Sequence, residues 1–176
     1  MSIFGNAYNT VSLTESLIPI SLGDSEEGVV PSISDPEERQ FIPRNMLRHH
    51  MSDSWEIKTA FKMMSALNDQ FKDKTRFCLA TPPPISDPEH IKKYLHIYQN
   101  NETEKIPPKD FRLACYQIQI ELYLEHCEKI GLPLILPPEN ALDKDGLLME
   151  KYWPEDPTHA NEAYGRLVID QILERL

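Results

Sequence analysis

Cysteine, glycine and positive charge are all scarce in this chain, and these shortages exclude several classes of protein. The 176 residues include 3 cysteines, an odd number, and none of them form a CxxC pair. Cys78 lies in an apolar run, whereas Cys115 and Cys127 fall within one predicted helix, so neither a disulfide framework nor a zinc site is indicated. We therefore expect a protein of a reducing compartment.

The shortage of positive charge argues against a nucleic-acid partner. The chain has 18 basic residues against 28 acidic ones, for a net charge of -10. No cluster of lysine and arginine interleaved with aromatics provides a local basic surface for a phosphate backbone. No apolar stretch reaches the length of a membrane span, and Met1 is followed by neither a basic nor an apolar leader region. We expect a cytoplasmic protein without a membrane partner.

Proline, in contrast, is abundant, with 15 residues against 6 glycines. The prolines fall between predicted elements, as at residues 82–84 and 137–138, where they stiffen the connections. Residues 11–42 are polar, interrupted by proline and without sustained periodicity. We expect this segment to form a long surface excursion with at most short helical turns.

Helical periodicity predicts several helices. Residues 43–53 form the first, and Ser54 caps the second. Residues 110–130 form a long helix that ends at Gly131, a shorter one is expected at residues 91–98, and an amphipathic helix ends the chain. Core-facing positions recur at helical spacing in the second helix, at Ile57, Ala60, Phe61, Met64, Leu67 and Phe71, and in the long helix, at Phe111, Cys115, Ile118 and Leu122.

Short apolar strands alternate with these helices. Residues 75–80 form one strand and residues 132–136 another, and each ends at a run of prolines that a central strand could not contain. This alternation predicts an α/β domain, with a parallel sheet covered by helices on both faces. Ligands of such sheets bind outside the carboxyl ends of the strands.

Near the C-terminus an acid and an imidazole lie three residues apart, at Asp156 and His159. Pro157 stiffens the turn, so the carboxylate can accept a hydrogen bond from one ring nitrogen and leave the other free. This is the orienting acid and general base of a nucleophilic hydrolase, and we expect a carboxylate oxygen within about 3.2 Å of the ring. Alternatively, Asp156 and Thr158 are turn and helix-cap residues that His159 merely follows.

Two motifs resemble blocks of the SGNH/GDSL hydrolase family. Residues 155–161 resemble its closing Asp-x-x-His block, and residues 5–9 resemble its Gly-x-Asn block. The resemblance implies a three-layer α/β/α fold of flavodoxin-like type with a parallel sheet. It also implies that His159 is the general base, that Asp156 holds its tautomer, and that Asn6 donates its amide to the oxyanion.

The same resemblance implies a chemistry. Members of this family cleave carboxylic esters through a serine acyl-enzyme, without metal or organic cofactor. A small-molecule or glycan ester is therefore the expected substrate, and carbohydrate O-acetyl groups are a plausible target.

The order of the motifs departs from the family pattern. The family's Gly-Asp-Ser nucleophile block precedes its Gly-x-Asn block, whereas here Gly23-Asp24-Ser25 follows Asn6. We therefore expect residues 1–176 to be a single SGNH hydrolase-like domain, truncated at its N-terminus, without the first two strands and without the nucleophile. Such a chain would lack serine-esterase activity when alone, with only weak residual catalysis by way of water, and would self-associate through an open sheet edge. Two alternatives remain: a complete small esterase that uses Ser25, and a non-catalytic α/β domain that binds a partner or glycan.

Overall fold

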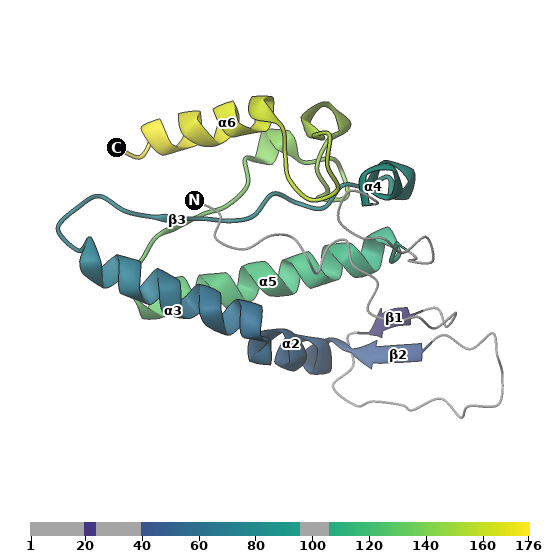
Figure 1. Ribbon diagram of the computed structural model, residues 1–176, viewed down its shortest axis with the longest axis horizontal. Coiled ribbons are helices and arrows are strands. Elements are labelled where there is room, and N and C mark those ends of the chain that lie inside the picture. Colours follow the sequence, from purple (N-terminus) through teal and green to yellow (C-terminus); the bar gives the residue numbers. More distant parts are fainter. Residues whose placement is uncertain (1–19, 24–39, 96–105) are drawn as a thin grey trace.

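The computed structural model of the protein describes residues 20–23, 40–95 and 106–176 (Figure 1). Asn6 and Ser25 lie outside these residues. The described elements follow one another as β1 (Ile20–Gly23), β2 (Gln40–Pro43), α2 (Arg44–Asp53), α3 (Trp55–Gln70), β3 (Cys78–Leu79), α4 (Pro88–Leu95), α5 (Lys109–Lys129), β4 (Leu134–Ile135), the 3-10 turns η1 (Glu139–Ala141) and η2 (Glu150–Tyr152), and α6 (Glu162–Leu173).

The strands form two separate parallel pairs. β1 pairs with β2, with Ile20 opposite Gln40, and β3 pairs with β4, with Cys78 opposite Leu134. The parallel pairing of β3 with β4, which α4 and α5 connect, agrees with the predicted α/β class. The expectation that residues 11–42 contain no strand is wrong, since β1 falls inside them and β2 begins there. Each of these strands is too short to give a visible period, and each depends on a partner distant in the sequence.

β3 and β4 are shorter than the sequence predicts, at two residues each. Their pairing continues beyond the strands, because Ala80 N–H donates to Ile135 O over 2.9 Å and Cys78 N–H donates to Pro133 O over 2.8 Å. Leu136 was expected inside a buried strand, but it is 43 % exposed because it follows the last paired residue of β4.

Ser54 separates α2 from α3, as predicted. Its N–H donates to Met51 O over 3.1 Å at the end of α2, and its Oγ accepts from Ile57 N–H over 3.3 Å at the start of α3. A serine in this role satisfies an amide that the first helical turn would otherwise leave unpaired. The prediction of a cap at this residue is therefore confirmed.

The predicted core face of α3 is correct for only part of the helix. Ile57, Ala60 and Met64 are buried in one cluster, whereas Leu67 is 40 % and Phe71 46 % exposed. The helix extends past the cluster that it covers, so these last apolar residues border an open groove of about 300 Å³. The expectation that Leu67 and Phe71 face the core is wrong for this reason.

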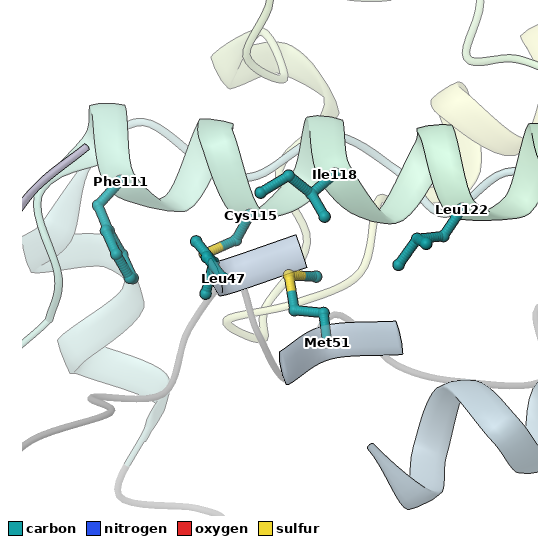
Figure 2. Close-up of a cluster of buried hydrophobic side chains, with 6 residues drawn as sticks. All are labelled: Leu47, Met51, Phe111, Cys115, Ile118 and Leu122. Carbon is teal, nitrogen blue, oxygen red and sulfur yellow. The ribbon is translucent and has the colours of Figure 1, made fainter. Parts of the chain in front are cut away.

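α5 crosses the middle of the molecule, with α2 and α3 on one side and the C-terminal segments on the other (Figure 1). Its predicted apolar face is confirmed. The buried cluster along that face consists of Phe111, Cys115, Ile118 and Leu122 with Leu47 and Met51 of α2 (Figure 2). A second face of α5 carries Tyr123 and Cys127, which pack with α3 and Leu132.

A third cluster of buried residues holds the C-terminal region in place. It consists of Ile85, Ile91, Ala141, Leu148, Tyr152 and Tyr164. Asn161 caps the start of α6: its Oδ1 accepts from Tyr164 N–H over 3.2 Å, and its Nδ2 donates to Lys151 O over 2.8 Å. These bonds fix the turn that precedes α6. None of the helices in the described residues is long and apolar enough to span a bilayer.

Candidate functional site

The candidate site is the turn between η2 and α6, where Asp156 and His159 meet. Oδ1 of Asp156 lies 3.1 Å from Nδ1 of His159, which confirms the predicted distance. The same oxygen accepts from the backbone N–H groups of Thr158 and His159, each over 2.8 Å. Nδ1 of His159 also lies 3.1 Å from Thr158 Oγ1, a hydroxyl that can donate or accept, so the ring nitrogen contacts both the carboxylate and this hydroxyl. When Nδ1 donates to the carboxylate, Nε2 keeps its lone pair.

The neighbouring residues hold this turn from both sides. Trp153 Nε1–H donates to Leu148 O over 2.8 Å, and Asn161 N–H donates to Tyr152 O over 2.9 Å. The N-cap of α6 is Asn161, so the alternative in which Asp156 or Thr158 caps the helix is wrong. Asp156 is nevertheless a turn residue, since its carboxylate binds two amides of its own loop.

Charge and exposure differ between the two side chains. Burial opposes ionisation of Asp156, but hydrogen bonds from the amides of Thr158 and His159, together with the imidazole, outweigh it and hold the pKa of Asp156 below its usual value. The Asp156 side chain is 22 % exposed and that of His159 63 %. At neutral pH the site therefore presents an anchored carboxylate beneath an accessible ring.

α4 supports the same loop through a histidine that the sequence did not single out. Nε2 of His90 lies 3.0 Å from Pro154 O, and its ring lies 5.1 Å from that of Trp153 and 5.0 Å from that of Tyr94, measured between centroids. His90 and Tyr94 are i, i+4 neighbours on α4, but no spacing pattern links them to Trp153 and Pro154. Their proximity depends on the packing of α4 against the C-terminal region.

The described residues place no serine hydroxyl within hydrogen-bonding distance of His159. A serine–histidine contact does occur elsewhere in these residues, where Ser65 Oγ lies 3.2 Å from His126 Nε2. That Nε2 also lies 3.1 Å from Phe61 O, and a carbonyl oxygen can only accept, so Nε2 carries a proton and cannot take one from Ser65. The His126 ring lies flat on Phe61, with centroids 4.1 Å apart, as in a structural contact.

A cleft of about 550 Å³ lies at the carboxyl ends of β3 and β4, where parallel sheets bind ligands. Its lining includes Pro83, Leu136, Pro137, Gln171 and Arg175. Within the described residues, Oε1 of Gln171 is buried without a hydrogen-bond partner. Asp156 and His159 do not line this cleft. In the described structure the Asp156–His159 pair therefore lies away from the carboxyl ends of β3 and β4.

Asn6 and Ser25 lie outside the described residues, so the oxyanion donor and the alternative nucleophile stay predictions. In the part of the chain that is described, no group of three or more His, Cys, Asp or Glu side chains could hold a metal ion.

Comparison of the chain with protein-family models, with curated proteins and with solved structures finds no match in any of the three. The resemblance to SGNH hydrolases therefore rests on the two sequence motifs alone.

Proposed function

We propose that Asp156 and His159 are the orienting acid and general base of an SGNH-like ester hydrolase, which acts on a carboxylic ester or a carbohydrate O-acetyl group. The observation that carries this proposal is the 3.1 Å contact between Asp156 Oδ1 and His159 Nδ1. In such a site the carboxylate holds the imidazole tautomer and stabilises the imidazolium that forms. Nε2 then removes the proton of the nucleophile, a contribution typically of about 10²–10⁴-fold in rate.

The geometry supports this role better than a role in the turn alone. A turn needs only the carboxylate and the backbone amides of Thr158 and His159, and it leaves the histidine ring unconstrained. Here the ring instead contacts the carboxylate, which the two amides hold in a fixed position. An oriented, accessible imidazole is the arrangement that proton transfer requires.

The serine nucleophile is proposed to come from a Gly-Asp-Ser segment other than Gly23-Asp24-Ser25. A Gly-Asp-Ser turn supplied beside His159 would complete the site, with Asn6 as the oxyanion donor. The complete-esterase alternative assigns this role to Ser25 within the chain.

The cleft at the strand ends favours a second candidate function. The side-chain oxygen of Gln171 is buried without a hydrogen-bond donor among the described residues. Charged side chains of both signs, Arg175, Glu121 and Glu139, also line the cleft. These groups suit a polar ligand, as the non-catalytic binding alternative requires, and that function would not depend on His159.

Co-expression tests the proposal. The chain would be produced with a fragment of an SGNH hydrolase that carries a strand followed by Gly-Asp-Ser, and turnover of p-nitrophenyl acetate would be measured. We expect turnover that His159→Ala abolishes and that His50→Ala, at an exposed position on α2, leaves unchanged. Turnover that survives His159→Ala would refute the base assignment.

A serine-directed phosphonate distinguishes the complete-esterase alternative. Its adduct would be located by peptide mass spectrometry on the chain alone. Adduct formation at Ser25 that disappears in His159→Ala would establish Ser25 as the nucleophile. The proposal expects no serine adduct on the chain alone.

A further inference from the structure

The fold brings together two cysteines that are distant in the sequence. Cys78 lies on β3 and Cys127 on α5, and Cys78 packs against the buried cluster that contains Cys127. Both belong to the same packed region, in which Cys127 is 1 % exposed and Cys78 is half-buried. The backbone fixes this approach, because Cys78 N–H donates to Pro133 O and Leu132 N–H donates to Cys127 O over 2.9 Å.

The two thiols differ in acidity. The hydrogen bond from Cys127 lowers the pKa of the Cys78 thiol below its usual value, an effect that outweighs burial. The same hydrogen bond and burial raise the pKa of Cys127. Cys78 is thus the more readily ionised sulfur, and Cys127 is the neighbouring thiol that keeps its proton. Nucleophilic and resolving cysteines divide their roles in this way.

Cys78 is the more accessible of the two cysteines. Cys78 lines the groove of about 300 Å³ beside the end of α3, together with Phe71 and Arg76. Cys127 lines a second hollow of about 340 Å³, between the end of α5 and β4. Leu132 lines both spaces, so the pair lies between two solvent-connected surfaces.

Cys115 provides an internal comparison. It is also on α5, but it is 0 % exposed and lies in the other buried cluster, against α2 (Figure 2). Burial raises its pKa to about 12. Its surroundings therefore favour neither ionisation nor attack by an oxidant.

We propose that Cys78 and Cys127 form a redox-active dithiol, which hydroperoxides convert into a reversible disulfide between β3 and α5. The Cys78 thiolate attacks the hydroperoxide, an S–O bond forms, the O–O bond breaks, and the alkoxide leaves with a proton from solvent as an alcohol. Cys127 then attacks the sulfenic sulfur, the S–S bond forms, and the leaving hydroxide takes the Cys127 proton as water. The dithiol loses two electrons and the hydroperoxide gains them.

The test uses the full chain after reduction. It is treated with equimolar hydrogen peroxide, its remaining thiols are blocked with N-ethylmaleimide, and its peptides are mapped by mass spectrometry without reduction. We expect two of the three thiols to be lost, a Cys78–Cys127 peptide pair to appear, and dithiothreitol to restore both thiols. On a non-reducing gel the oxidised chain should run as a single chain, because the link is intramolecular.

Variants separate the roles of the sulfurs. Cys115→Ser should form the same linked peptides in the same yield. Cys127→Ser should stop at a sulfenic acid on Cys78, which dimedone traps. The parent chain decides the proposal even where a variant fails to fold. Oxidation of Cys78 without the linked peptide, a link between two chains, or no loss of thiols would each overturn it.

Discussion

The buried guanidinium of Arg112 donates to the carbonyl oxygen of Ile85, so the first turns of α5 hold the segment that follows β3. It also donates to Ser86 O and Pro107 O, each over 3.1 Å. Burial lowers the pKa of Arg112 to about 10, and the charge of Asp87 opposes this effect. The side chain thus remains a cation at neutral pH and satisfies three backbone acceptors.

Replacing Arg112 with methionine should destabilise the fold. The substitution keeps much of the side-chain volume but leaves three carbonyl groups without their donor, so we expect a loss of about 2–4 kcal/mol in the free energy of unfolding. Urea denaturation followed by circular dichroism measures this loss. The matched control is Arg166→Met, at a 74 % exposed side chain that pairs with Glu162, where we expect a change within about 0.5 kcal/mol. Equal effects of the two substitutions would contradict the role assigned to Arg112.

Two glycines should respond to alanine in opposite directions. Gly131 ends α5 with φ of 64°, a conformation that alanine adopts at a cost of about 1 kcal/mol. Gly165 lies within α6, and a Cβ atom there would meet nothing within 4 Å, so alanine should stabilise the helix by about 0.5–1 kcal/mol. Thermal unfolding of the two variants tests both signs. A Gly131→Ala chain as stable as the parent would contradict the left-handed end of α5.

The contact of His126 with Phe61 predicts a pH dependence of stability. Burial lowers the pKa of His126, although its bond to Phe61 O opposes the shift. As the pH falls below about 6.5, the His126 imidazole therefore becomes protonated in the unfolded chain before it does in the folded chain. The free energy of unfolding should decrease in that range.

Urea denaturation at several pH values between 7.5 and 5 tests this linkage. His126→Gln should lose about 1 kcal/mol at pH 7.5, because the ring stack is gone, and should show a smaller decrease toward pH 5 than the parent. His50→Gln, at an exposed position, is the control and should follow the parent curve. A His126→Gln chain with the parent's full pH dependence would show that His126 is not the group responsible.

The sequence predicts this structure best where signals are local. Ser54 as a cap, the apolar face of α5 and Gly131 at its end all depend on neighbouring residues, and each is confirmed. The parallel strands β1 and β2 were missed because their hydrogen bonds join segments that carry no mutual pattern. Leu67 and Phe71 were misplaced because periodicity identifies a helix face but not how far its packing partner extends.

The contacts of the candidate site, too, were predictable only where the residues are close in the sequence. Asp156 and His159 are close in the sequence, so their contact was predictable from spacing and from Pro157 between them. The support from His90, and the meeting of Cys78 with Cys127, arise from packing between distant elements and leave no trace in the spacing of residues.

Hydrolysis of p-nitrophenyl acetate by the chain alone is the measurement that tests the Asp156–His159 base most directly. An oriented base without a serine nucleophile should still activate water, so we expect weak turnover above buffer that falls at least about tenfold in His159→Ala. Asp156→Asn should reduce it as well, whereas His50→Ala should retain it. A His159→Ala chain as fast as the His50→Ala control, or a parent chain no faster than buffer, would contradict the account.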